Sequence, residues 1–356
     1  MLALDPFKVL LPAVISFIIG IFIAPTIGRF LIRNKFWKKK NVTKSIDGKD
    51  APISAKLHND EGNPIPRLGG IVVWSSVFIT AFLFWALSHI YPVTITQKLV
   101  FISRNQTWLP LMAMAVGAIL GALDDLLVVE AFGSRFGSYV GGGLSFPIRF
   151  IVVSLLGLFA GSWFYLKLGV SSVYMPFVGD IHMGGLLFII FFILVTLATF
   201  STGVIDGVDG LSGGVMSAVF TAYGMIAFTH GQINISAFCF VVVGGIMAFL
   251  WFNIPPALFY LTETGMLSLS LSLSVVAFLT NAVLYLPIIA FPLVATTMSV
   301  ILQLFWKKFF KRKLFLVAPL HNHFQAKGWP SYKVTMRYWI VSYMCAMLGV
   351  IIVLVS

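Results

Sequence analysis

The chain has 356 residues, of which 59% are apolar and only 10% charged, whereas soluble domains carry about 25% charged residues. This composition excludes an ordinary soluble protein and a disordered chain, and the long unbroken apolar runs exclude an outer-membrane barrel, in which polar and apolar residues alternate. The formal charge of +12 then indicates membrane orientation and an anionic membrane surface rather than nucleic-acid binding.

Apolar runs of about 20 residues are long enough to cross a bilayer. Residues 266–304 contain no charged side chain and as one helix would be about 60 Å long, so we expect two spans there, with a turn between Asn281 and Pro287. The predicted fold is one all-α integral membrane domain over residues 1–356. Its ten spans lie near 9–32, 69–91, 107–123, 146–166, 186–204, 212–230, 236–252, 265–284, 286–305 and 334–355.

Lysine and arginine gather in loops that this count places on one side of the membrane. Residues 33–67 and 307–313 are strongly basic, and the first segment contains Lys35, Lys38, Lys39, Lys40, Lys44, Lys49 and Lys56. With both segments in the cytoplasm, 20 of the 24 basic residues face inward, as the positive-inside rule expects. The outward-facing ones are Lys8, Lys98, Arg104 and Lys167. Both termini are then expected outside.

The cytoplasmic loops of this arrangement also hold most membrane-proximal carboxylates. Asp124 and Asp125 end the third span, where ionisable residues are costly and usually functional. Adjacent helical residues point to different faces, so we expect one to bind metal or act as a base while the other orients it. The alternative is a helix-end pair that faces headgroup water.

Asp206 and Asp209 lie in the sequence IDGVDGLSGG. Their spacing of three places both carboxylates on one helix face or together in a tight turn. The flanking Gly207 and Gly210 let the backbone approach a ligand closely. The alternative is a polar turn between spans five and six.

Asn253 and Glu263 bracket a segment in which Pro255 and Pro256 break the helix. Glu263 then begins span eight, where it suits either a metal or the helix dipole.

His321 and His323 lie in the sequence APLHNHFQAKGWP. Two histidines without a nearby cysteine are too few for a zinc site, so phosphate binding or acid–base chemistry is the functional reading. Packing beside Phe324 and Trp329 at the membrane interface is the alternative. The basic and aromatic run 306–313 is interpreted as a positive-inside anchor.

Several carboxylates, without a cysteine nucleophile or a Walker-type glycine loop in the sequence, favour chemistry with a hard cation such as Mg²⁺. A cytoplasm-facing membrane site can meet a lipid phosphate from the bilayer and a nucleotide from water.

At these motifs the chain resembles the polyprenyl-phosphate N-acetylhexosamine-1-phosphate transferase superfamily, most closely its muramoyl-pentapeptide branch. The segment PIPRLGG instead is similar to the branch that transfers GlcNAc-1-phosphate. The matching segments are PIPRLGG (64–70), LDD (123–125), GLS (143–145), DGVDGL (206–211), FNIPPA (252–257), ETG (263–265) and APLHNHFQAKGW (318–329), followed by KVTMRYWI.

The resemblance implies ten transmembrane helices in the bacterial cytoplasmic membrane, with a cytoplasmic active site, and homodimers in some members. It implies Mg²⁺-dependent transfer of phospho-N-acetylmuramoyl-pentapeptide from a UDP-linked donor to undecaprenyl phosphate, which releases UMP and forms lipid I for peptidoglycan. The alternatives are a UDP-GlcNAc donor, a non-catalytic homologue that binds lipid phosphate, and a transporter of an anionic solute or lipid.

The resemblance also assigns roles by position. Asp124, Asp125, Glu263 and His321 would be catalytic, and Asp124 and Glu263 would also hold the metal. Substrate binding would fall to Asp206, Asp209, Asn253, His323 and Arg149, the last in place of a family lysine.

Several positions depart from the family pattern and motivate the non-catalytic alternative. Glu263 replaces an aspartate and Asn322 interrupts a triple histidine. The others are Phe200, Gly203, Thr296 and Gln325.

Overall fold

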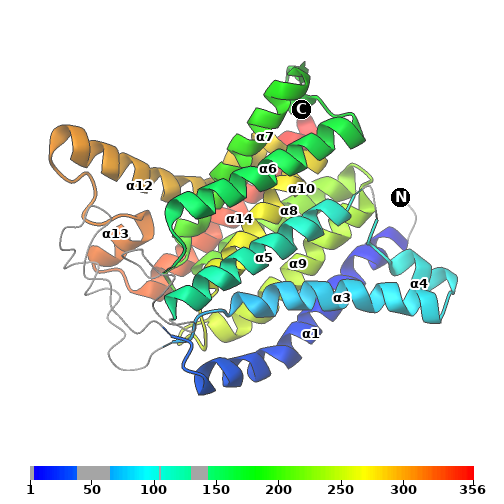
Figure 1. Cartoon of the computed structure of the whole chain (residues 1–356), viewed down its shortest axis with the longest axis horizontal. Helices are drawn as coiled ribbons and strands as arrows, with labels where there is room; N and C mark the ends of the chain where they lie inside the picture. The colour runs from blue at the N-terminus through cyan, green and yellow to red at the C-terminus, as the bar shows by residue number, and fades with distance from the viewer. Residues whose placement is uncertain (1–3, 38–64, 104–105, 130–142) are drawn as a thin grey trace.

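The computed structural model describes residues 4–37, 65–103, 106–129 and 143–356 as a bundle of long helices (Figure 1). Part of the predicted basic loop, and one arginine that was predicted to face outward, lie outside the described residues. These are Lys38, Lys39, Lys40, Lys44, Lys49, Lys56 and Arg104.

Ten helices in the described part of the chain are long and apolar enough to cross a membrane, which confirms the predicted number. They are α1 (Leu4–Arg33), α3 (Gly70–Ile90), α5 (Trp108–Val128), α6 (Phe146–Leu168), α7 (Gly184–Ser201), α8 (Leu211–Thr229), α9 (Ile233–Asn253), α10 (Thr262–Leu279), α12 (Phe291–Phe310) and α14 (Ser331–Val355).

Shorter elements connect these helices, and the all-α prediction missed one of them, an antiparallel hairpin that pairs Ser172 with His182 and Met175 with Gly179. Its strands are too short for alternation to reveal them. The connecting elements are α4 (Thr94–Leu99), β1 (Ser172–Met175), β2 (Gly179–His182), η1 (Thr202–Ile205), η2 (Val283–Tyr285), α11 (Leu286–Ile289) and α13 (Leu320–Ala326).

The uncharged stretch 266–304 contains two helices, as predicted, but their boundaries were wrong by about five residues. α10 already ends at Leu279, and Asn281 has a φ of 54°, in the left-handed region that Asn tolerates after a helix. α12 begins only at Phe291, with Pro292 in its first turn. The intervening residues form η2 and α11.

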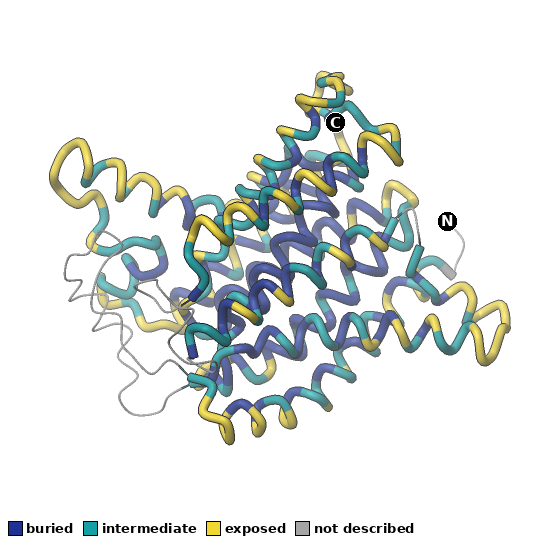
Figure 2. Tube along the Cα trace, viewed as in Figure 1, coloured by how far each residue is buried: buried dark blue, intermediate teal, exposed yellow. Residues whose placement is uncertain are grey.

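α10 lies at the centre of the bundle, and α8 and α9 are also buried on most sides (Figure 2). Residues 267–274 alternate leucine and serine, a period that suits a half-buried strand. In this central helix every face is covered, so no amphipathic stripe is needed. The four serine hydroxyls donate to carbonyl oxygens three residues earlier in α10 itself, which satisfies them locally.

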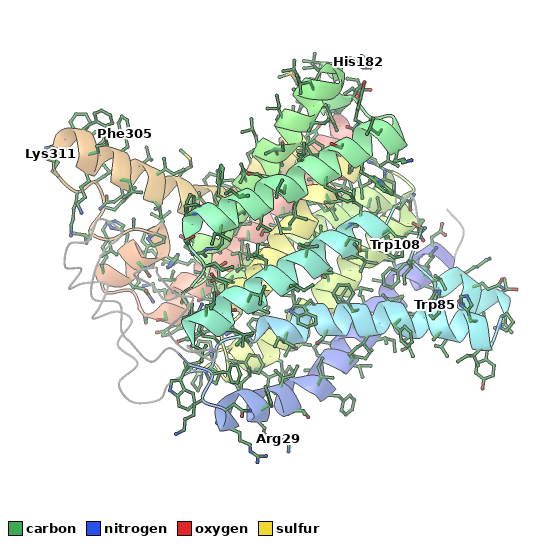
Figure 3. The ribbon with its side chains drawn as sticks, in the orientation of Figure 1. Arg29, Trp85, Trp108, His182, Phe305 and Lys311 are labelled. Carbon is green, nitrogen blue, oxygen red and sulfur yellow. The ribbon has the colours of Figure 1, made fainter. Side chains whose placement is uncertain are left out.

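The start of α1 and the end of α14 lie at one end of the bundle, together with the β1–β2 hairpin that carries His182 (Figures 1 and 3). The C-terminal ends of α5 and α9 and the start of α10 lie at the other end. α12 leans away from the bundle there, with Phe305 and Lys311 at its outer tip (Figure 3).

Two glycines bring α5 and α10 into backbone contact. A Cβ added at Gly121 would lie 2.2 Å from the carbonyl oxygen of Glu263, and one at Gly117 would lie 2.5 Å from that of Leu267. Spacing of four places both glycines on one face of α5, as in the small-residue contacts of membrane helices. This contact sets the distance between the carboxylates of α5 and Glu263.

We expect Gly121→Ala to destabilise the protein by about 1–3 kcal/mol, the range for overpacking a tight contact, because α10 must move to admit the methyl group. Thermal unfolding in detergent measures this effect. Gly203→Ala is the matched control, since its added Cβ would lie 3.9 Å from the nearest atom. Equal stability of the two variants would contradict the close α5–α10 contact.

Candidate active site

Asp125 is fully buried at the end of α5 and accepts hydrogen bonds from two other segments of the chain. Arg67 donates from Nε and Nη2 to one carboxylate oxygen, at 3.0 and 2.9 Å. The other oxygen accepts the hydroxyls of Thr262 and Thr264, at 2.5 and 2.6 Å, and the backbone N–H of Thr264 at 3.0 Å. Such saturation holds a carboxylate in one orientation.

The segment before α3 is bound to the start of α10 by its backbone. Tyr260 N–H donates to Pro66 O, and Gly69 N–H donates to Tyr260 O. Burial by itself lowers the pKa of the Arg67 guanidinium, but the adjacent Asp125 charge opposes this, and the pKa of Arg67 is raised overall. Arg67 therefore stays charged and ties this segment to α5.

Asp124 points to a different side of α5, as expected for adjacent helical residues. Its carboxylate accepts the backbone N–H of Leu144 at 2.6 Å and lies 3.7 Å from Nη1 of Arg149. Gly143 approaches so closely that an added Cβ would lie 2.6 Å from Asp124 Oδ1. The GLS segment thus covers this carboxylate.

Arg149, in the first turns of α6, joins Asp124 to Glu263. The same Nη1 lies 3.2 Å from Glu263 Oε1, and the Glu263 side chain is 26% exposed, whereas that of Asp124 is 3% exposed. Two carboxylates from α5 and α10 therefore face one cationic group, and Glu263 is the more accessible of them.

The donor set formed by Asp124 and Glu263 fits a divalent cation. Their oxygens approach one point, now taken by the Arg149 guanidinium, and Mg²⁺ is commonly held by one or two carboxylates together with substrate phosphates. No group of three or more His, Cys, Asp or Glu side chains able to hold a metal occurs in the described part of the chain. Substrate oxygens would thus have to complete the coordination.

Asp206 and Asp209 lie in the turn between η1 and α8, and their carboxylates contact different partners. Asp206 accepts the Ser212 hydroxyl at 2.6 Å and the Thr262 N–H at 2.8 Å. Burial raises the pKa of Asp206 above its ordinary value, against the opposing effect of these two hydrogen bonds. Asp209 accepts the backbone N–H of Ala257 at 3.3 Å. Asp206 thus joins the turn to the first residue of α10, and Asp209 joins it to the segment before that helix.

Asn253 is buried at the end of α9 and binds backbone with both ends of its amide. Its oxygen accepts the N–H of Gly210, and its nitrogen donates to Phe259 O, each at 2.8 Å. Gly210 has a φ of 72°, a conformation that favours glycine. Asn253 therefore shapes the aspartate turn.

His321 and His323 lie on α13, which packs on α12 and α14. His321 is buried, whereas Nδ1 of His323 accepts the N–H of Leu316 at 3.2 Å. Burial and the neighbouring Lys327 ammonium lower the pKa of His323, which favours its neutral form at pH 7. The structure places the histidines on helices other than those that carry Asp124 and Glu263.

The structure thus brings together Asp124, Asp125, Glu263 and Arg149, with Asp206 adjacent through Thr262. Sequence reasoning missed Arg67, Thr262 and Thr264 as partners of Asp125. Arg67 had one available signal, because it stands in the PIPRLGG motif directly before a membrane span.

A family model described as glycosyl transferase family 4 matches residues 107–281, which include α5, the GLS segment, the aspartate turn and Glu263. A phospho-N-acetylmuramoyl-pentapeptide-transferase of Chloroflexus aurantiacus is 30% identical, over 99% of this chain and 91% of the relative. Enzymes with that name from Geobacillus sp. and Levilactobacillus brevis are also 30% identical, over 96% and 81% of this chain and 97% and 84% of the relatives.

Proposed function

The chain belongs to the family of phospho-N-acetylmuramoyl-pentapeptide transferases within glycosyl transferase family 4, and from this premise we propose which reaction it performs. It is a multi-pass membrane phosphosugar transferase. We propose that it transfers phospho-N-acetylmuramoyl-pentapeptide from a UDP-linked donor to undecaprenyl phosphate, releasing UMP and forming lipid I. The observation that carries this proposal is the convergence of Asp124 and Glu263 on one cationic group.

In the proposed reaction, an oxygen of the lipid phosphate attacks the donor phosphorus that bears the sugar. The bond from that phosphorus to the oxygen bridging to UMP breaks, and UMP leaves with the electron pair. A phosphate monoester has a second pKa of about 6, so a fraction of the acceptor still carries a proton at neutral pH. We propose that Asp124 accepts that proton, while Asp125 fixes the end of α5 on which Asp124 lies.

The cationic groups of the site would lower the repulsion between two anionic substrates. Mg²⁺ held by Asp124 and Glu263 would supply charge neutralisation at the reacting phosphates. The Arg149 guanidinium would then exchange one of its carboxylate partners for a phosphate oxygen of a substrate. Asp206, Asp209 and His323 are proposed to contact the donor, and His321 is proposed to act in catalysis.

We propose that the end of the bundle bearing these carboxylates faces the cytoplasm of a bacterial cell. The basic residues at the end of α12, the helix that projects from that end (Figure 1), support this orientation. Lys307 and Lys308 lie in its last turn, and Lys311, Arg312 and Lys313 directly follow it.

The test is UMP release by the purified chain in detergent with undecaprenyl phosphate. We expect release with UDP-MurNAc-pentapeptide and Mg²⁺, and its loss when EDTA removes the metal. A parallel reaction with UDP-GlcNAc tests the second donor, which is favoured by the similarity of the PIPRLGG segment to the branch that transfers GlcNAc-1-phosphate. If folded protein released no UMP with either donor, this result would contradict the proposal and support the non-catalytic homologue.

A further inference from the structure

A crevice of about 250 Å³ opens between α12, α13 and α14, on helices other than those of the carboxylate site. Its walls are almost wholly apolar and include Ala295 of α12, Leu320 and Phe324 of α13, and Val341 of α14. Leu320 and Phe324 are four residues apart and so share one face of α13. The volume lies below the 300–1,000 Å³ typical of small-molecule pockets, so it suits one chain of a larger ligand.

The walls of the crevice belong to the two helices that are least covered by the rest of the protein. In an 18-residue apolar stretch of each helix, only 17% of α12 and 22% of α14 are buried. α12 also diverges from the bundle above α13 (Figure 1). The crevice therefore faces the bilayer, where the available occupant is a lipid chain.

A cationic and aromatic group lies beside the apolar walls. The Arg337 guanidinium, which itself lines the crevice, lies 4.2 Å from the ring centroid of Trp329, and Lys333 Nζ lies 5.3 Å from it. Trp329 in turn stacks on Phe324 at 4.8 Å. Arg337 is six residues beyond the start of α14, or about 9 Å along the helix, which is a depth from which Arg reaches the headgroups.

Within the described residues, neither Arg337 nor Lys333 forms an ion pair with a carboxylate. The ion pairs of arginine there join Arg67 to Asp125 and Arg149 to the other two carboxylates of the site. Both Arg337 and Lys333 are exposed. Two positive charges beside an apolar slot complement a ligand with a negative headgroup and a hydrocarbon chain. Trp at this level matches the aromatic belt of a membrane interface.

We propose that this crevice binds an anionic glycerophospholipid, with one acyl chain between α12, α13 and α14 and its phosphate on Arg337 and Lys333. The bound chain supports the face of α13 formed by Leu320 and Phe324, and so holds the helix that carries His321 and His323. The site is distinct from the carboxylate cluster and does not rest on the proposed reaction.

Native mass spectrometry of the full chain in detergent, with equal amounts of phosphatidylglycerol and phosphatidylcholine, tests the site. We expect Arg337→Gln to lower phosphatidylglycerol retention about fivefold, as expected for the loss of one cation near a lipid phosphate. Lys308→Gln is the matched control, because Lys308 also lies over an aromatic ring, 5.8 Å from the centroid of Phe309, but does not line the crevice. Its retention should equal that of the unchanged protein.

A second pair of variants tests the apolar slot and serves if Arg337→Gln fails to fold. Val341→Trp fills the crevice and should remove the bound phosphatidylglycerol, whereas Ile340→Trp changes the adjacent lipid-exposed residue and should not. Phosphatidylglycerol retention unchanged in Arg337→Gln and Val341→Trp would overturn the proposal. The proposal would also be overturned if these two variants still bound phosphatidylglycerol but no longer bound added undecaprenyl phosphate. The occupant of the crevice would then be the substrate lipid.

Discussion

Replacing Asp124 with asparagine is expected to lower UMP release by about 10²–10⁴-fold, the contribution of a positioned acid or base. The amide oxygen can still accept the Leu144 N–H, but the amide cannot take up a proton or bind a cation as a carboxylate does. Arg149 retains Glu263 as a partner, so the free energy of unfolding should change by no more than about 1 kcal/mol. Initial rates and thermal unfolding of the purified variant measure the two effects.

Activity within about threefold of the unchanged protein would remove Asp124 from the proton-transfer role. The assay should use saturating Mg²⁺ as well as a lower concentration, because a weakened metal site would be rescued by excess metal whereas a lost base would not.

The same substitution at the next residue has a different expected result. Asp125→Asn leaves the Arg67 guanidinium without its carboxylate, and the one remaining amide oxygen cannot accept from both Arg67 and the two threonine hydroxyls. Breaking a buried ion pair by removal of one partner costs about 3–5 kcal/mol. We therefore expect loss of UMP release together with a large fall in the unfolding temperature, measured in the detergent used for Asp124→Asn.

The two variants are each other's control, since they differ by one position and remove the same charge. If Asp125→Asn were inactive yet as stable as Asp124→Asn, Asp125 would have a direct chemical role and its hydrogen bonds would contribute little to stability.

The ten spans were predictable because each is a long apolar run and because basic residues lie in the loops between several of them. The different orientations of Asp124 and Asp125 also followed from helix geometry. Which aspartate is the anchor did not follow, because the partners of Asp125 are 58 residues away at Arg67 and 137 residues away at Thr262. Such contacts arise only when α3, α5 and α10 meet.

The fold also overrode local patterns that the sequence shows clearly. The leucine and serine alternation before Val275 is a strand-like pattern, yet α10 is a helix because its neighbours cover every face. Asn253 remains a candidate for substrate binding, and in the structure its amide binds the backbone at Gly210 and Phe259. A polar residue beside a predicted site can be required by the turn that forms the site.

The glycine contact between α5 and α10 divides the site into a fixed part and an adjustable part. Asp124, Asp125 and Glu263 lie on two helices whose backbones touch, so their mutual spacing cannot change without separating the pair. Arg149 comes from α6, which packs mainly on α7 and only marginally on α5. We therefore expect α6, the helix that carries Arg149, to move when the site takes donors of different size. Selectivity among donors should then evolve through the α6–α7 contact, while the helices that carry the carboxylates stay unchanged.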